Sequence, residues 1–218
     1  VSNYTKGIII NRYGIPPDKI IAIHNGIEKN TNKKRNELKG FSGEKVVTFL
    51  GRITFQKGPE YFIEAAYMVL QKNDNVRFIM AGSGDLKDRM IRRVKALGIS
   101  GKVSFPGFLK HDEVRKLLNL TDVFVMPSVS EPFGISPLEA LQAKVPVIIS
   151  KQSGVSEVLS HAIKVDYWDV NALADAINGV LNYKLLSKLL ATKGNNEVTK
   201  LEWEKTGKKI LNIYNSLV

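Results

Sequence analysis

The chain has 218 residues, of which 44% are apolar and 24% charged, a balance typical of a globular protein with a sizeable core and not of a disordered chain. It contains no cysteine, which excludes disulfides, thiolate metal ligands and a cysteine nucleophile. The three histidines, His24, His111 and His161, lie far apart in the sequence, so we interpret them as packing or surface residues and predict no metal site. No apolar run approaches the roughly 18 residues that span a bilayer, and we expect a cytoplasmic protein.

The net charge of +11 and the isoelectric point near 9.7 predict an anionic partner. Nucleic acid, a membrane surface and a phosphorylated small molecule would each fit. Lys33, Lys34 and Arg35 lie in a polar, Asn-rich stretch, and the other basic residues are scattered without interleaved aromatic residues. This pattern favours a solvated linker over a nucleic-acid patch, so we expect no nucleic-acid partner.

The first 27 residues differ in pattern from the rest of the chain. They predict a helix at about residues 3–13, a turn at GIPPDK and a short strand in IIAIHNG, followed by a basic linker over residues 28–44. Such a lead-in is typical of the end of one domain and a hinge, and we expect a partner domain to precede it.

From residue 45 onward, β-rich runs alternate with segments of helical period such as residues 59–72 and 85–98. This alternation predicts an α/β domain over residues 45–168, a doubly wound, Rossmann-like parallel sheet with helices on both faces. Ligands of such sheets bind beyond the carboxyl ends of the strands. The expected strands are residues 45–51, 75–82, 102–108, 122–128, 145–150 and 162–166.

Residues 169–218 form the last segment and predict a helical C-terminal extension with a break at Gly194 and Asn195. We expect these helices to pack on the domain, and docking on a domain outside this chain is the alternative for an apolar stripe on the last helix. The residues of the stripe are Trp203, Ile210, Ile213 and Leu217.

The first loop after a strand, GRITFQKG (51–58), predicts a phosphate site. Gly51 permits a tight turn, and Arg52 and Lys57 flank a helix that begins near Pro59. Arginine offers a planar fork, lysine a movable point charge and a helix start free N–H groups, all suited to phosphate. The alternative is two exposed surface cations.

The next two loops could also face a ligand. In AGSGD, Gly82 and Gly84 would let the backbone approach a ligand closely, or would simply form a tight turn. In FPGFL, Phe108 and Leu109 could support a flat base, or could be buried in the core.

The fourth loop, EPFGISPLE, contains two carboxylates. Ser136 at the N-cap, Pro137 and Glu139 predict a capping box, in which the glutamate bonds back to the cap N–H. A capping box does not explain Glu131. Carboxylates accept hydrogen bonds from vicinal hydroxyls, and a helix start beside them would suit a diphosphate, so the loop predicts a nucleotide-sugar site.

These stretches, together with SVSEPFGISPLEALQAKVPVIIS and SGVSEV, resemble in order and spacing the C-terminal nucleotide-sugar-binding domain of GT-B glycosyltransferases of family 4 and their glycogen synthase-like relatives. The pair Glu131 and Glu139 is the most specific element of the resemblance. The first 27 residues resemble the end of that family's N-terminal domain and its hinge.

The resemblance implies a retaining hexosyltransferase without an obligatory metal or other cofactor, whose donor is a UDP-, ADP- or GDP-sugar. The acceptor would be a sugar, glycan or lipid-linked molecule, and peripheral contact with an anionic membrane would suit the last of these. This chain alone would be inactive without an N-terminal domain that carries the acceptor site. Alternatives are a noncatalytic nucleotide-sugar-binding module and α-glucan elongation of the glycogen or starch synthase type.

The resemblance also implies residue roles. Arg52 and Lys57 would bind the donor diphosphate and stabilise the leaving group, Glu131 would hold the sugar, and Glu139 would bind the ribose. The other residues implied to lie near the donor are Gly51, Gly82, Gly84, Phe108, Leu109, Phe133, Gly134, Ile135, Ser136 and Leu138.

Two positions depart from the family pattern. Ser153 and Gly154 replace a usual Gly-Gly pair, and Lys144 stands where glycine usually precedes the Pro-Val strand. A lysine there would be strained if the position needs a positive φ.

Overall fold

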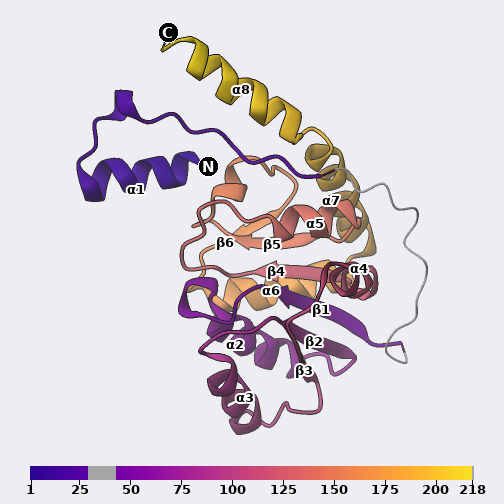
Figure 1. Ribbon diagram of the computed structural model, residues 1–218. Coiled ribbons are helices and arrows are strands. Elements are labelled where there is room, and N and C mark those ends of the chain that lie inside the picture. Colours follow the sequence, from indigo (N-terminus) through magenta and orange to yellow (C-terminus); the bar gives the residue numbers. More distant parts are fainter. Residues whose placement is uncertain (29–42, 218) are drawn as a thin grey trace.

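A six-stranded, all-parallel sheet forms the centre of the computed structural model, which describes residues 1–28 and 43–217 (Figure 1). The strand order is β3-β2-β1-β4-β5-β6, so the chain builds outward from β1 in one direction and from β4 in the other. The predicted doubly wound α/β sheet is confirmed. The strands are β1 Lys45–Leu50, β2 Val76–Ala81, β3 Val103–Gly107, β4 Val123–Met126, β5 Val147–Ser150 and β6 Ile163–Val165.

Helices cover both faces of the sheet (Figure 1). The α-helices within the domain are α2 Pro59–Leu70, α3 Lys87–Ala96, α4 His111–Leu120 and α5 Ser136–Gln142, and α6 Val170–Asn182 and α7 Lys184–Val198 follow the last strand. Three further short helical turns are η1 Pro17–Lys19, η2 Phe55–Lys57 and η3 Gly154–Glu157.

Alternating residues of the central strands divide the core into two layers. In β4, Val123 and Val125 pack with apolar side chains of α2, α3 and α6, whereas Phe124 and Met126 pack with those of α5 and α7. All four side chains are buried. This alternation is the period of a strand that is covered on both faces, and it fixes the strand register.

The predicted helix break at Gly194 and Asn195 is wrong, because α7 continues through both residues. A side chain at position 194 would collide with the side chain of Leu141, since its Cβ would lie 2.5 Å from Leu141 Cδ2. Asn195 Nδ2 donates a hydrogen bond of 2.9 Å to the Leu141 carbonyl oxygen. The two residues therefore serve the close packing of α7 on α5 and do not interrupt the helix.

The N-terminal segment runs beside the start of the last helix, α8 Trp203–Asn215. It contains α1 Asn3–Tyr13, as predicted, but the expected strand in residues 20–26 is not formed. The chain there is irregular and makes an isolated bridge at Ile27, whose N–H donates to the Leu201 carbonyl 2.9 Å away. Among the described residues this segment pairs with no strand beyond that bridge, so its apolar pattern does not reflect sheet pairing.

The apolar stripe of α8 does not pack on the domain. Trp203, Ile210 and Leu217 are 47%, 40% and 78% exposed, and α8 extends away from the sheet (Figure 1). The expected packing on the domain is therefore found for α6 and α7 but not for the stripe of α8, and docking on a domain outside this chain stays a prediction. The predicted linker lies almost entirely outside the described residues.

Lys144 is the non-glycine residue with a positive φ (56°) in the described ranges, so the strain expected from the sequence is present. It follows α5 in a Schellman motif, in which the Lys144 N–H donates to the Leu141 carbonyl at 2.9 Å and the Val145 N–H to the Ala140 carbonyl at 2.9 Å. A left-handed conformation suits glycine in this position far better than lysine.

We expect Lys144→Gly to raise the free energy of unfolding by about 0.5–1 kcal/mol, because it removes the left-handed strain. Chemical denaturation measures the change. The matched control is Lys188→Gly, at an exposed position within α7, which should lower stability by about 1 kcal/mol. A Lys144→Gly protein as destabilised as this control would contradict the assignment of strain.

Candidate functional site

A buried ion pair joins the loops that follow the two central strands. Lys57 Nζ donates to Glu131 Oε2, and the two side chains are only 19% and 9% exposed. Lys57 ends η2 after β1, and Glu131 follows β4, the neighbour of β1 in the sheet. This is the point at which the strand order reverses, where doubly wound sheets bind their ligands. Removal of either partner would leave a buried charge uncompensated.

Backbone contacts fit the same two loops together. The Val129 N–H donates to the Gln56 carbonyl at 2.9 Å. Gly58 has φ 65°, and a Cβ there would lie 2.1 Å from the Pro127 carbonyl oxygen. Gly58 had no role predicted from the sequence, although the Gly-Pro that follows Lys57 was the available signal.

Arg52 lies at the exposed edge of this site. Its Nη2 donates a hydrogen bond of 3.2 Å to Gln56 Oε1. The guanidinium is exposed, and Gln56 orients it on the same loop that presents Lys57. Two cations thus stand at the end of β1, one fixed by a buried carboxylate and one open to solvent.

Gly82 and Gly84 pack against the first loop. A Cβ at Gly82 would lie 1.8 Å from the Gly51 carbonyl oxygen, and a Cβ at Gly84 would lie 2.3 Å from that of Ile53. The Ile53 N–H also donates to the Ser83 carbonyl at 2.8 Å. Close packing of backbone on backbone is therefore sufficient to require both glycines, and their implied role beside a donor stays a prediction.

The third loop leaves an aromatic ring open to solvent. Phe108 follows β3 and is 76% exposed, which excludes the alternative that it belongs to the core. Leu109 is partly buried against a small cluster that includes Leu117. Phe108 remains available to a flat ligand.

The predicted capping box at Ser136 is wrong. Ile135 is the N-cap and already has helical angles (φ −84°, ψ −35°), and no side chain caps the helix. Glu139 is consequently the fourth helical residue, and its N–H donates to the Ile135 carbonyl at 3.1 Å. Its carboxylate is therefore not used to cap α5.

Glu139 is half-buried, and no hydrogen-bond partner for its carboxylate lies within the part of the chain that the structure describes. Burial raises the pKa of Glu139, and the nearby His111 opposes this effect. A partly desolvated carboxylate without a partner is an acceptor that hydroxyl groups of a ligand could satisfy.

The remaining candidate site residues of this loop differ in how exposed their side chains are. Ile135 is 42% exposed, whereas Phe133 and Leu138 are buried in the apolar layer beneath α5. Gly134 has φ 100°. Phe133 and Leu138 can thus offer a ligand only backbone atoms, and the Leu138 N–H already donates to the Ile135 carbonyl.

Two buried hydroxyls of the central loops were not anticipated from the sequence. Thr54 Oγ1 follows β1 and Ser128 Oγ follows β4, and neither has a hydrogen-bond partner among the described residues. Buried polar atoms left unpaired cost about 1–3 kcal/mol each. They lie in the same two loops that carry Lys57 and Glu131, and the sequence offered no signal for them beyond the residue types.

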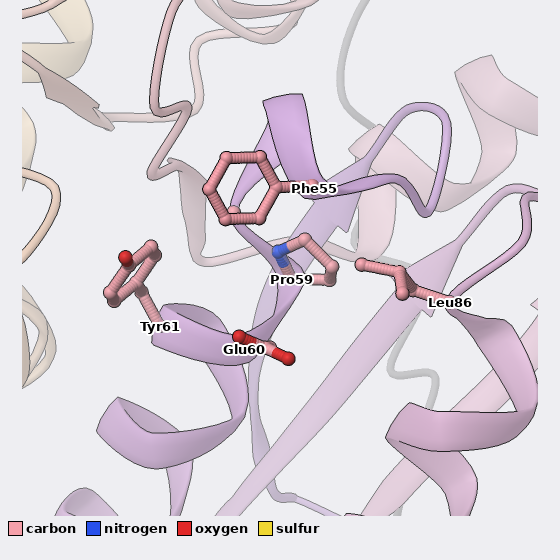
Figure 2. A pocket seen from close by; sticks show the side chains of 6 residues that line it. Phe55, Pro59, Glu60, Tyr61 and Leu86 are labelled. Atoms are coloured by element: carbon pink, nitrogen blue, oxygen red, sulfur yellow. The ribbon is translucent and has the colours of Figure 1, made fainter.

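A shallow hollow lies next to this region, at the start of α2 (Figure 2). It encloses about 150 Å³, part of which is open solvent, and its walls are largely apolar. None of the site residues predicted from the sequence lines this hollow. Its lining residues are Phe55, Gly58, Pro59, Glu60, Tyr61 and Leu86.

Residues 30–197 match the family model described as glycosyl transferases group 1. The chain is 33% identical over 229 residues to the uncharacterized glycosyltransferase MJ1607 of Methanocaldococcus jannaschii, covering 98% of this chain and 58% of that protein. It is 32% identical over 159 residues to the 2-deoxystreptamine N-acetyl-D-glucosaminyltransferase of Niallia circulans, covering 72% of this chain and 41% of that enzyme. The chain thus spans about half the length of these relatives.

Solved glycosyltransferase structures share the fold. Anabaena HepE in complex with UDP and glucose superimposes with a TM-score of 0.88 at 21% identity, over 99% of this chain and 62% of that one. TarM of S. aureus, in complex with UDP among other molecules, gives 0.82 at 23% identity, over 99% and 43% of the two chains.

We expect Gly82→Ala to lower the free energy of unfolding by roughly 1–3 kcal/mol or more, because the new methyl group would overlap the Gly51 carbonyl. Gly101→Ala is the control, since nothing lies within 4 Å of a Cβ there. It should change stability by less than about 0.5 kcal/mol. Equal effects of the two changes in urea denaturation would refute the close packing of the loops.

Glu139→Gln should raise stability at neutral pH. Because the pKa of Glu139 is higher in the folded than in the unfolded protein, the ionised carboxyl destabilises the fold at any pH above both pKa values. At a pH below both values the carboxyl is neutral in both states and has no such effect. The gain should therefore shrink as pH falls from the raised pKa of the folded state to the unfolded value of about 4.3, and should be absent at lower pH. Denaturation curves at several pH values measure it, and a gain independent of pH would contradict the desolvation of Glu139.

Proposed function

Because the chain belongs to the family of glycosyl transferases group 1, we propose that it is the donor-binding domain of a retaining, metal-independent family 4 enzyme. The enzyme would transfer a hexosyl group from a nucleoside diphosphate sugar to a sugar, glycan or lipid-linked acceptor. The observation that carries the proposal is the buried Lys57–Glu131 pair at the β1–β4 switch point, with the unpartnered Glu139 on the helix that follows.

The proposed chemistry is leaving-group stabilisation. As the bond between the sugar and the diphosphate breaks, its electron pair passes to the diphosphate oxygen, and Arg52 and Lys57 receive the growing negative charge. The acceptor hydroxyl attacks the anomeric carbon from the same face and gives up its proton to the departing diphosphate, so that no protein nucleophile is needed. Arg52 and Lys57 would do the work that Mg²⁺ does in other transferases.

The two carboxylates would hold the two ends of the donor. Glu139 has no partner in the described ranges and would accept the ribose hydroxyls. Glu131 would bind hydroxyls of the sugar and steady positive charge on its ring. Because Glu131 also holds Lys57, the cation stands in place before the donor arrives, which reduces the reorganisation that the reaction requires.

The rest of the enzyme is also part of the proposal. We place residues 1–27 at the end of an N-terminal domain that carries the acceptor site, and the exposed stripe of α8 suits contact with that domain. No helix within residues 1–28 and 43–217 is long and apolar enough to cross a membrane. We propose a cytoplasmic enzyme, and its charge of +11 would suit peripheral contact with an anionic membrane that presents a lipid-linked acceptor.

Calorimetric titration with UDP, ADP and GDP tests the donor site. UDP is the first choice, since it is bound in HepE and TarM, whose folds this chain shares. Arg52→Ala and Glu139→Ala should each weaken binding of the preferred nucleotide roughly 10- to 100-fold, which is the worth of one charge-assisted contact.

The matched control is Arg92→Ala, an exposed arginine of α3 away from these loops, and it should change affinity by less than about twofold. Affinity that is equal in wild type, Arg52→Ala and Glu139→Ala would overturn the proposed site. A transfer assay on the full-length enzyme separates catalysis from nucleotide binding alone. Transfer should be present in the wild type and lost in Lys57→Ala.

A further inference from the structure

Glu157, the last residue of η3, holds the first turn of α1. Its carboxylate accepts hydrogen bonds from the Asn3 N–H at 2.9 Å, the Tyr4 N–H at 2.6 Å and Asn3 Nδ2 at 3.2 Å. The first N–H groups of a helix have no partner within the helix, and a carboxylate at that end is favoured by the helix dipole. The resemblance of SGVSEV to a family motif assigned no role to this glutamate.

The same turn of α1 contacts the loop that carries Glu131. Ser2 Oγ donates to the Pro132 carbonyl oxygen at 2.6 Å, and Tyr4 Oη donates to Ser130 Oγ at 3.2 Å. Ser2 is 1% exposed. Hydrogen bonds that are partly shielded from water are stronger than fully exposed ones, so α1 helps to fix residues 130–133.

Residues 152–155 also hold this loop, through backbone hydrogen bonds. The Glu131 N–H donates to the Gln152 carbonyl at 3.0 Å, and the Gly154 N–H donates to the Glu131 carbonyl at 2.9 Å. Gly154 also fills the space between the layers, since a Cβ there would lie 2.2 Å from the Pro132 carbonyl oxygen and 2.5 Å from Ser2 Cβ. The loop with Glu131 is thus held by α1 and by the segment that runs into η3; Glu157 contacts the first of these and belongs to the second.

His24 completes the arrangement. Its Nε2 lies 2.8 Å from Glu157 Oε2, and its ring lies 5.9 Å from that of Phe133. Burial would raise the pKa of Glu157, but the hydrogen bonds with His24, Asn3 and Tyr4 outweigh burial and lower it. The carboxyl is therefore ionised at neutral pH, in the form that accepts all of these bonds.

We infer that Glu157 is a positioning residue for Glu131: by anchoring the first turn of α1 against residues 130–133, it sets the carboxylate that holds the donor sugar. The sugar-holding part of this inference rests on the proposed function. The anchoring itself does not depend on any ligand.

The chain contains a matched control for this role. Glu197 Oε2 accepts from the Ser160 and His161 N–H groups at 3.0 and 3.1 Å, and its Oε1 lies 2.7 Å from His161 Nδ1. The side chains of Glu157 and Glu197 are 21% and 18% exposed. The two carboxylates thus make the same kind of contacts at similar burial, but those of Glu197 do not reach residues 130–133.

Hydrogen exchange without ligand is the first test. Glu157→Gln should speed exchange in the peptide that covers residues 129–135 by about tenfold, because an amide is a weaker acceptor than a carboxylate and the loop opens more often. Glu197→Gln should leave this peptide at the wild-type rate. An unchanged rate in Glu157→Gln, or an equal increase in both variants, would overturn the inference.

Binding of UDP-glucose and UDP is the second test. Glu157→Gln should reduce the preference for UDP-glucose over UDP by roughly tenfold, since the sugar contact is lost while the nucleotide contacts remain. Glu197→Gln should keep the wild-type preference. If wild type binds neither compound, the proposed function fails for this chain, while the exchange experiment still decides whether Glu157 positions the loop.

Discussion

The site depends on one largely buried ion pair between the loops that follow the two central strands. Lys57 and Glu131 come from loops 74 residues apart, and parallel pairing of β1 with β4 brings those loops to the same edge. A charge pair with so little exposure is tolerated only when its partners are fixed, because either charge alone would be strongly destabilising there. The backbone packing of these loops on each other, with Gly58 against Pro127, supplies that fixation.

Further segments pack against the two loops that carry this ion pair. Gly82 and Gly84 bring the loop after β2 against the loop after β1, and residues 152–155 bring the loop before β6 against Glu131. The first turn of α1 then closes over the outer side of the Glu131 loop through Ser2 and its neighbours. The first turn of α1, more than a hundred residues away in sequence, therefore forms part of the site, and a movement of α1 would shift the Glu131 loop.

Much of the fold follows from local sequence pattern. Strands buried on both faces are near-continuous apolar runs, and their helices carry a clear apolar period, so the sheet is predictable, as is the place of its ligand edge. The positive φ of Lys144 was also foreseeable, because a C′ position after α5 needs a left-handed residue.

The predictions that were wrong concern features that depend on tertiary contacts, which local sequence pattern does not reveal. S-P-L-E has the pattern of a capping box, yet α5 begins at Ser136 with Ile135 as its N-cap, and the Glu139 carboxylate is not used as a cap. Gly194 resembles a helix break, yet it lets α7 approach Leu141. The anchoring role of Glu157 depends on contacts more than 150 residues away in sequence, and local pattern carries no signal for it.

A crystal structure of this chain with a bound nucleoside diphosphate sugar would test the central claim most directly. The account predicts the diphosphate within hydrogen-bond distance of Arg52 and Lys57, the ribose on Glu139 and the sugar on Glu131. A ligand seated elsewhere, for example in the hollow beside Phe55 and Tyr61, with the Lys57–Glu131 pair untouched, would contradict it.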